Sequence, residues 1–476
     1  MGSNDNSGLG PGKPAIATGS HDLAITEEYA AIMRGNWADT ETTPDQISVA
    51  VWTPQRRAEL RAALPGERLV VPSGRMKVRS NDQYFRFRAH SAYVWLTGDQ
   101  SSDGVFVLEP SGDAVVYLRP RSHRLDAAFY TDRKYGELWA GRRPTLRESS
   151  LSLGIESRHI DELDLTAPCR VLRGVDEMVD SLAKPTAGSW ERDAELTTLL
   201  SELRLRKDEW EVAELRHACD ITTRAFEDVV RAIPGAKTER SLEAAFWSRA
   251  RIEGNDVGYN SIVAAGAHAT MLHWIDNDGP LEAGDLLLLD AGVETTNLYA
   301  ADVTRVLPLS GRFTPLQRDL YELTRMANDA ALGMIAPGVA FRAYHLAAMR
   351  VFAHGLLDLG ILPCSVDEAM ETGVYRRWTL CGSGHMLGLD IHDCAQARAN
   401  AYLDGVLEVG HVLTVEPGLY LQPDDLLLPV ELRGLGFRIE EDLVVTATGY
   451  DMLSDQLPRE ASEVESWMHR VATSTR

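Results

Sequence analysis

Four acidic residues and one histidine stand next to apolar runs, in a pattern that could bind metal ions. Asp290 ends the apolar run 286–289, and Asp302 follows within a second apolar run. The turn expected between them, 295–297, is centred midway, so an antiparallel hairpin would place Asp290 opposite Asp302, with Cβ atoms about 4.5–5.5 Å apart. Two carboxylates this close are costly to bury unless cations lie between them. Taken alone, the pair is equally compatible with one aspartate being a turn or edge residue.

The same arrangement recurs later in the chain with Glu416 and Glu440. Each glutamate follows a short apolar run, and the two runs could pair as a second hairpin. Between the two acidic pairs lies His385, flanked by Gly384 and Gly388, which permit close approach of the backbone. A single histidine is more often a core residue than a ligand, so the informative feature is the whole set.

The five residues together predict a site for two divalent cations. Two aspartates and two glutamates carry four negative charges, which two such cations balance, and the imidazole adds a neutral nitrogen. Oxygen ligands with one imidazole suit Mn²⁺, Co²⁺, Fe²⁺ or Zn²⁺, and not a structural zinc held by thiolates. Metal ions about 3.5–4 Å apart and bridged by carboxylates can hold a hydroxide nucleophile near neutral pH. The set therefore predicts hydrolytic chemistry.

Helices and antiparallel strands are expected to position this set. One helix is expected over 193–231, and a second from near 238 or 241 to Gly254. A third begins at Thr314, followed by proline and, three residues on, glutamine, which together form a capping box. Strand-like runs lie at 286–294, 299–309, 412–421 and 437–446. This order predicts an α+β domain built from hairpins.

The N-terminal part, 21–188, mixes short strands with helical stretches, which indicates a smaller α/β domain. The run 93–96 is interpreted as a strand, and 105–118 as a hairpin around a Pro-Ser-Gly-Asp turn. The first 20 residues are rich in Gly, Ser, Asn and Pro and are expected to form a disordered tail. A linker is expected at 184–189, so the catalytic part is assigned to 189–476.

Composition narrows the class of protein. The chain has 476 residues, enough for two or three domains, and its net charge of −22 argues against nucleic acid as a partner. Five widely spaced cysteines without a Cys-x-x-Cys pair argue for a reducing compartment. No apolar run approaches the length of a membrane span, and the N-terminus lacks the apolar stretch of a secretory signal. A cytoplasmic protein with no membrane and no nucleic-acid partner is expected.

The candidate ligands and their neighbours resemble motifs of the pita-bread metallopeptidases, and within them of the aminopeptidase P and prolidase branch. The motifs stand here as Leu289-Asp-Ala-Gly292, Asp302-Val-Thr-Arg305, Gly384 to Asp393, Glu416-Pro-Gly418 and Arg438-Ile-Glu440-Glu441. Segment 85–98 is also similar to that branch and distinguishes the chain from methionine aminopeptidases, which generally lack this domain. The likeness extends roughly over 82–457. It implies a pita-bread catalytic domain of the α+β class with a smaller α/β N-terminal domain.

The resemblance also implies how the five residues would share two metal ions, with Mn²⁺ foremost and Co²⁺, Zn²⁺ or Fe²⁺ as alternatives. Asp302 and Glu440 would bridge both ions. Asp290 would complete the coordination of one ion, and His385 with Glu416 that of the other. Glu416 would also be the general base, or proton acceptor, for the bridging water.

Further roles come from the same resemblance. His273 and His392 match histidines that hydrogen-bond the scissile carbonyl and the tetrahedral intermediate. Arg438 would orient the substrate or Glu416. Cys381 departs from the pattern, because many members have histidine there and a thiol is a weaker donor than imidazole. The contact made at this position and the preferred peptide length are therefore not carried over.

The implied activity is hydrolysis of the bond between an N-terminal residue and a following proline. Xaa-Pro is a tertiary amide with no N–H, which ordinary peptidases accommodate poorly. The alternatives are a dipeptidase limited to Xaa-Pro dipeptides and, in a different class, a non-catalytic module that binds peptides or proteins. The non-catalytic module and a creatinase-like, metal-independent hydrolase are disfavoured because all five ligands are present. The family often forms homo-oligomers, so a homodimer or homotetramer is expected.

Overall fold

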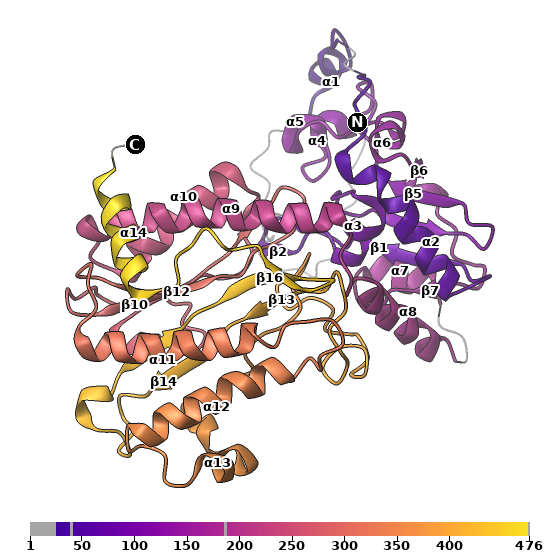
Figure 1. Cartoon of the computed structure of the whole chain (residues 1–476). Coiled ribbons are helices and arrows are strands. Elements are labelled where there is room, and N and C mark those ends of the chain that lie inside the picture. Colours follow the sequence, from indigo (N-terminus) through magenta and orange to yellow (C-terminus); the bar gives the residue numbers. More distant parts are fainter. Residues whose placement is uncertain (1–24, 39–40, 185–187, 475–476) are drawn as a thin grey trace, which may run out of the picture.

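The computed structural model describes residues 25–38, 41–184 and 188–474, which form an N-terminal lobe and a C-terminal lobe (Figure 1). The tail expected at 1–20 and the middle of the linker expected at 184–189 lie outside the described residues. Helices combine with mainly antiparallel strands, so the α+β prediction is confirmed.

The N-terminal lobe is built on one mixed sheet. Its strands are β1 (Leu69–Pro72), β4 (Val105–Leu108), β5 (Ala114–Leu118), β6 (Glu156–His159) and β7 (Arg170–Val171), and a separate ribbon pairs β2 (Val78–Ser80) with β3 (Gln83–Tyr84). The sheet order is β6-β5-β4-β1-β7. The hairpin expected at 105–118 is confirmed, because β4 and β5 pair antiparallel. The helices are α1 (Glu27–Met33), α2 (Thr53–Ala63), α3 (Ser91–Thr97), α4 (Ala128–Thr131), α5 (Glu137–Ala140), α6 (Leu146–Leu153) and α7 (Glu177–Leu182).

The strand expected at 93–96 is wrong, because this run lies in helix α3. His90 caps the helix, since its Nδ1 accepts a hydrogen bond from the Ala92 N–H at 3.2 Å. Gly98 ends the helix in the left-handed region, at φ 72°. Every residue of α3 is buried, so its apolar run cannot be distinguished from a buried strand by periodicity.

The C-terminal lobe places helices on two sides of short antiparallel sheets. The helices of this lobe are α9 (Glu209–Ala232), α10 (Glu239–Glu253), α11 (Pro315–Leu332), α12 (Ala343–Asp358), α13 (Val366–Thr372) and α14 (Ala461–Thr473). The preceding helix, α8 (Ser189–Leu203), packs against α2 and β7 of the N-terminal lobe. In Figure 1, α9 and α10 run along one side of the strands, and α11 and α12 along the other. In the part of the chain that the structure describes, no helix is long and apolar enough to cross a membrane.

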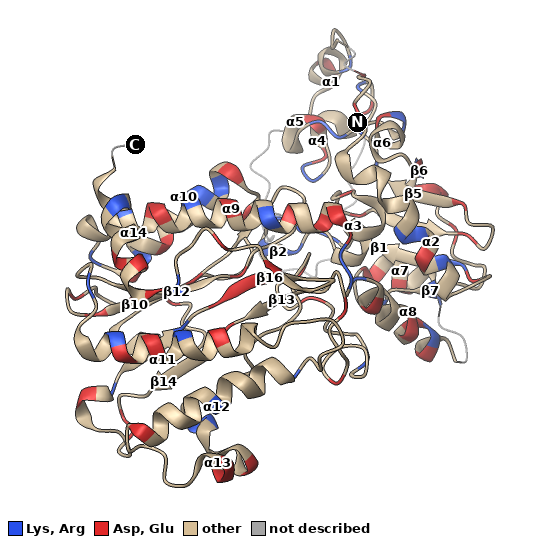
Figure 2. Cartoon of the chain, viewed as in Figure 1, with Lys and Arg blue, Asp and Glu red and all other residues tan. Residues whose placement is uncertain are grey.

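Four small sheets lie between these helices. Their strands are β8 (Asp256–Val257), β9 (Ile262–Ala265), β10 (Leu286–Asp290), β11 (Val293–Glu294), β12 (Thr304–Pro308), β13 (Val412–Val415), β14 (Gly418–Leu421), β15 (Leu435–Arg438), β16 (Glu441–Thr446) and β17 (Gly449–Met452). The orders are β12-β10-β9, β11-β8, β13-β16-β17 and β14-β15. Figure 2 shows acidic residues on outer helix faces and also on β16, between the helix layers.

The helix expected over 193–231 is in fact two helices, because the chain breaks between α8 and α9. Asp208 starts α9 with a capping box, in which its side chain accepts from the Glu211 N–H and the Glu211 side chain accepts from the Asp208 N–H. The expected end at Gly254 and the expected capping box at Thr314 are both confirmed.

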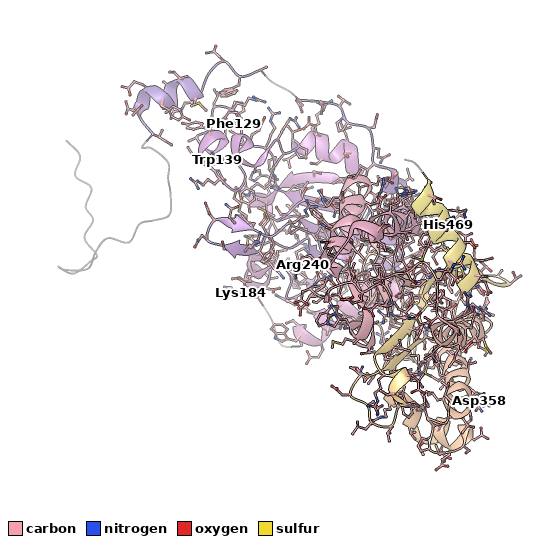
Figure 3. The ribbon with its side chains drawn as sticks, turned by 90° about the vertical axis from the view of Figure 1, so that its left-hand side faces the viewer. Phe129, Trp139, Lys184, Arg240, Asp358 and His469 are labelled. Atoms are coloured by element: carbon pink, nitrogen blue, oxygen red, sulfur yellow. The ribbon has the colours of Figure 1, made fainter. Side chains whose placement is uncertain are left out.

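Charged side chains join the two lobes. Arg56 of α2 donates to Asp208 at the start of α9, at 2.7 and 2.9 Å. Arg88, just before α3, pairs with Glu294 at 2.5 Å. Arg56 and Glu294 are buried, so water screens these pairs less than it screens an exposed pair. In the side view of Figure 3, Phe129 of the N-terminal lobe and Asp358 of the C-terminal lobe lie far apart, on opposite sides of the molecule.

His90 makes this junction sensitive to pH. Burial and the nearby Arg204 guanidinium lower the pKa of His90 to about 4. The folded protein therefore holds a neutral imidazole at His90. The stability that depends on this neutral form is complete above the ordinary pKa of about 6.5, and it is lost as the pH falls through about 4. We expect His90→Asn to keep the helix cap and to remove this part of the pH dependence. Thermal unfolding between about pH 7.5 and pH 4 measures it, and equal pH dependence in both proteins would contradict it.

Candidate metal centre

Asp290 and Asp302 come from the hairpin of β10 and β12, in a register that differs from the expected one. Asp290 pairs with Thr304 and not with Asp302, so the predicted pairing is wrong by two residues. The reason is the turn, which is closed by a hydrogen bond of 2.8 Å from the Thr295 N–H to the Tyr299 carbonyl and is therefore centred one residue later. Asp302 still lies on the same face as Asp290, diagonally across the hairpin, where side chains remain neighbours.

Glu416 and Glu440 come from the second hairpin, whose pairing is confirmed. β13 pairs with β16 and β14 pairs with β15 in one shared register, and Glu416 faces Glu440 in the gap between the two ladders. Asn328 of α11 holds both strands at this gap. Its Nδ2 donates to the carbonyls of Val415 and Ile439, at 3.0 and 3.1 Å, and these residues directly precede the two glutamates.

Two glycines allow the backbones around the site to approach closely. A Cβ at Gly292 would lie 1.6 Å from the carbonyl oxygen of Ala301, on the facing strand of the first hairpin. A Cβ at Gly384 would lie 2.1 Å from the carbonyl oxygen of Thr414. No side chain fits at either position, and so the segment before His385 can lie directly against β13.

The two hairpins and the His385 segment open onto one pocket of about 640 Å³. All the residues singled out in the sequence line it: His273, Asp290, Asp302, Cys381, His385, His392, Glu416, Arg438 and Glu440. The structure thus brings together residues that span more than a third of the chain. Its apolar walls come from Ile262, Leu272, Ile275 and Ile391.

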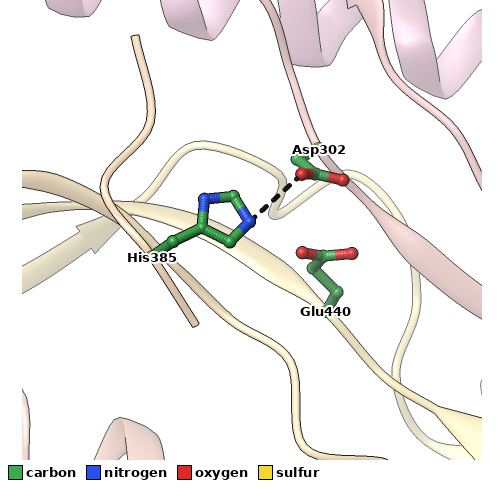
Figure 4. Close-up of side chains that lie close together, drawn as sticks. All are labelled: Asp302, His385 and Glu440. Carbon is green, nitrogen blue, oxygen red and sulfur yellow. Dashed lines mark ion pairs between the residues drawn. The ribbon is translucent and has the colours of Figure 1, made fainter. Parts of the chain in front are cut away.

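Three of these side chains converge on one point (Figure 4). Donor atoms of Asp302, His385 and Glu440 all lie within 4.8 Å of one another. His385 Nε2 is 3.4 Å from Asp302 Oδ2 and 3.4 Å from Glu416 Oε1. Asp290 joins from the other side through Tyr259, whose hydroxyl lies within hydrogen-bond distance of carboxylate oxygens of both aspartates.

Hydrogen bonds orient the imidazole of His385 toward the acidic side chains. Its Nδ1 lies 3.1 Å from the Met386 carbonyl, which fixes the ring and leaves Nε2 directed at the carboxylates. The backbone is held as well, because the His385 N–H donates to Thr414 Oγ1 at 3.1 Å. Nε2 therefore points into the acidic cluster, toward Asp302 and Glu416.

Arg438 and two hydroxyl groups support the acidic side chains. Arg438 pairs with Asp290 and donates to Thr304 Oγ1 at 3.2 Å and to the Tyr420 hydroxyl at 2.8 Å. Thr304 in turn donates to Glu440 Oε2 at 2.7 Å. Three supporting residues were not predicted from the sequence: Tyr259, Thr304 and Tyr420. Only Thr304 carried a signal, since it stands within the Asp302-Val-Thr-Arg305 motif.

The acidic residues of the pocket destabilise one another's charged forms. Burial raises the pKa of Asp290 and Glu440, and the neighbouring carboxylates raise both further. Burial raises the pKa of Glu416 to about 7, with His385 opposing the shift and Asp302 adding to it. The pKa of His385 rises to about 9, because Asp302 and Glu416 outweigh the effect of burial. Two cationic side chains, His385 and Arg438, are too few to neutralise four carboxylates.

The residues fit divalent metal ions on these grounds. Four converging carboxylates and one oriented imidazole are the hard donor set that Mn²⁺, Co²⁺, Fe²⁺ and Zn²⁺ accept. The repulsion that raises the pKa values is the interaction that added positive charge would remove. The buried Asp442 holds the backbone at Asp302 in place, since it accepts a hydrogen bond from the Asp302 N–H at 2.9 Å.

His273 stands on the loop between β9 and β10, and this loop is held by a residue that the sequence analysis missed. Glu239, fully buried at the start of α10, accepts hydrogen bonds from the backbone of Ala265 and Gly279, both at 2.7 Å. It also bonds the side chains of His268 and Trp274, at 2.8 and 2.9 Å. A glutamate at a helix start gave no signal of these long-range contacts.

Cys381 lines the pocket where many related proteins are expected to carry histidine. Burial and the Glu416 carboxylate raise the pKa of its thiol to about 11. The thiol therefore stays protonated and offers only a weak hydrogen-bond donor. Nearby, Ser383 is bonded to His345 at 2.9 Å.

Comparison with known proteins extends over nearly the whole chain. Residues 213–447 match the profile of metallopeptidase family M24, and residues 53–173 match that of the aminopeptidase P N-terminal domain. Xaa-Pro aminopeptidase 1 of Streptomyces coelicolor is 50% identical over 457 residues, which cover 93% of this chain and 92% of that protein. Xaa-Pro aminopeptidase of Escherichia coli K12 is 30% identical over 449 residues, 89% of this chain and 98% of that protein.

A solved structure is similar as well. The aminopeptidase PepP of Pseudomonas aeruginosa superposes with a TM-score of 0.79 at 31% sequence identity, and covers 90% of this chain and 100% of its own.

Asn328 offers a test of how the second hairpin holds its two glutamates. We expect Asn328→Ala to lower the free energy of unfolding by about 1–3 kcal/mol, because it leaves two buried carbonyls without donors. We also expect weaker binding of Mn²⁺, measured by calorimetry. Asp319→Ala, on an exposed turn of the same helix, is the control and should change stability by less than about 0.5 kcal/mol. Equal stability of the Asn328 variant and the control would contradict this role.

Proposed function

The chain belongs to metallopeptidase family M24, in its aminopeptidase P branch, and on that premise we propose that it removes the N-terminal residue from peptides whose second residue is proline. It is a hydrolase, and its pita-bread catalytic domain with a smaller N-terminal domain is the architecture expected from the motifs. The named activity of the similar Streptomyces and Escherichia coli proteins supports the substrate. The observation that carries the proposal is the convergence of four carboxylates and one imidazole in a single pocket.

Five residues are proposed to hold two divalent ions, with Mn²⁺ foremost and Co²⁺, Zn²⁺ or Fe²⁺ as alternatives. They are Asp290, Asp302, His385, Glu416 and Glu440, with Asp302 and Glu440 shared between both ions. When bound, such ions supply a hydroxide nucleophile near neutral pH and polarise the scissile carbonyl. The donor set and the mutual repulsion of its carboxylates support this assignment.

The remaining work is assigned to side chains of the same pocket. Glu416 accepts the proton of the attacking water and passes it to the leaving proline nitrogen. His273 and His392 donate hydrogen bonds to the oxygen of the scissile carbonyl, where negative charge develops. Arg438 fixes Asp290 through its ion pair and so sets the shape of the acidic cluster. The apolar walls exclude water from the reacting bond, which strengthens each of these interactions.

Three further assignments accompany this function. The domain boundaries are set at 21–188 and 189–476, which enclose the two matched profiles. A cytoplasmic location accords with five free cysteines. A homodimer or homotetramer is proposed, since Leu426, Leu427 and Val430 expose apolar side chains that association between copies would cover.

Replacing a shared ligand tests the metal assignment. We expect Asp302→Ala to lower turnover of an Xaa-Pro-Xaa peptide at least about a hundredfold and to reduce bound metal, because one carboxylate serves both ions. Circular dichroism should show a folded protein. Asp451→Ala, an exposed acidic residue of β17, is the matched control and should leave turnover unchanged. Retained turnover in a folded Asp302 variant would refute the assignment.

Metal removal and peptide length separate the proposed function from its alternatives. We expect chelation to abolish turnover and Mn²⁺ to restore it, with Xaa-Pro-Xaa tripeptides cleaved faster than Xaa-Pro dipeptides. Parallel assays with Co²⁺, Zn²⁺ and Fe²⁺ rank the metals. Preference for dipeptides would identify a dipeptidase, and a protein that binds none of these ions would be a non-catalytic module.

A further inference from the structure

The loop that carries His392 is held from outside the pocket by charged residues. Lys207 Nζ donates to Asp393 Oδ2 at 2.9 Å, and Arg204 pairs with the other oxygen of Asp393. Arg204 also donates to Asp390 at 2.8 Å. These cations come from the break between α8 and α9, so the two aspartates on either side of His392 are bound to the same short segment.

The N-terminal lobe completes this arrangement. Ser91, the first residue of α3, donates to Asp390 Oδ1 at 2.5 Å. Arg88 donates to the backbone carbonyl of Leu389 and lies 3.6 Å from Asp390. Thus both lobes contact the loop from Leu389 to Asp393.

The centre of the cluster is deeply buried. The side chains of Lys207 and Asp393 are each 1% exposed, and that of Arg204 is 6% exposed. A Cβ at Gly388 would lie 2.3 Å from Asp393 Oδ2 and 2.9 Å from Lys207 Cε, so glycine is required for the pair to fit. Buried ion pairs seldom stabilise a fold more than apolar residues of similar size do. A geometric role explains the cluster better than stability does.

His392 depends on this geometry because its own side chain is held by little else. Among the described residues, none makes a hydrogen bond or ion pair with its imidazole. The ring meets that of His385 edge-on, with centroids 4.4 Å apart. Its position over the pocket therefore follows from the backbone of its loop.

We propose that Arg204, Lys207 and Ser91 are positioning residues that fix His392 over the pocket through Asp390 and Asp393. The proposal rests on the role of His392 in the proposed function. It makes the N-terminal lobe part of the machinery that acts on the scissile carbonyl, although none of the described residues of that lobe lines the pocket. The proposal also explains why the motif has glycine at position 388 and aspartate at position 393: the glycine leaves room for the buried pair that Asp393 forms with Lys207.

The test measures kcat and KM for an Xaa-Pro-Xaa peptide with the full-length, Mn²⁺-loaded protein. We expect Ser91→Ala to lower kcat about threefold to tenfold and Lys207→Met to lower it further, with little change in KM or bound metal, because the histidine is displaced slightly. In a His392→Ala background, neither substitution should cause a further loss. Arg206→Gln is the matched control, since Arg206 lies in the same segment with a side chain 70% exposed.

Hydrogen exchange of the backbone amides of 386–393 provides a readout that does not depend on activity. Exchange should speed up in Ser91→Ala and Lys207→Met but not in Arg206→Gln. Equal losses of kcat with and without His392 would overturn the proposal, as would unchanged kcat in Ser91→Ala. If Lys207→Met does not fold, Lys207→Arg, which keeps the charge and alters the distance, replaces it. Full activity of His392→Ala alone would instead refute the assigned role of His392.

Discussion

The mutual repulsion of four carboxylates in one pocket is the constraint on which the catalytic lobe depends. Asp290, Asp302, Glu416 and Glu440 reach one pocket only because two hairpins hold them there against this repulsion. Asn328 binds both strands of one hairpin at the residues before the glutamates. Arg438 ties one hairpin to the other through Asp290 and Thr304. Regular strand pairing in the second hairpin thus continues to the residues on either side of the two glutamates.

Three glycines are as important for the shape of the site as the charged side chains, because they have no Cβ. At Gly292 and Gly384 the facing carbonyl oxygen occupies the space that a Cβ would need. At Gly388 the obstacle is the buried pair of Lys207 and Asp393. Each glycine therefore has a separate steric reason, and none of the three serves as a flexible joint.

Local chemistry explains which features could be predicted from the sequence. The capping box at Thr314 and the helix end at Gly254 depend on neighbouring residues, and both predictions are confirmed. The register predicted for the first hairpin was wrong by two residues, because the residues of the turn do not determine where the turn is centred. The run 93–96 was misread because burial on every side removes the periodicity that distinguishes helix from strand. Glu239, Asn328 and Lys207 were missed because their partners lie far away in the chain, and a sequence does not display such contacts.

The separation of the two hairpins along the chain affects how the protein is made. During synthesis, the hairpin with Asp290 and Asp302 leaves the ribosome well before Glu416 and Glu440 exist. A nascent chain therefore carries only half of the acidic cluster and, of the repulsion in the finished pocket, only the part between the two aspartates. The cluster can form only after Glu440 has been synthesised, 150 residues after Asp290. Assembly of the pocket consequently follows the synthesis of both hairpins.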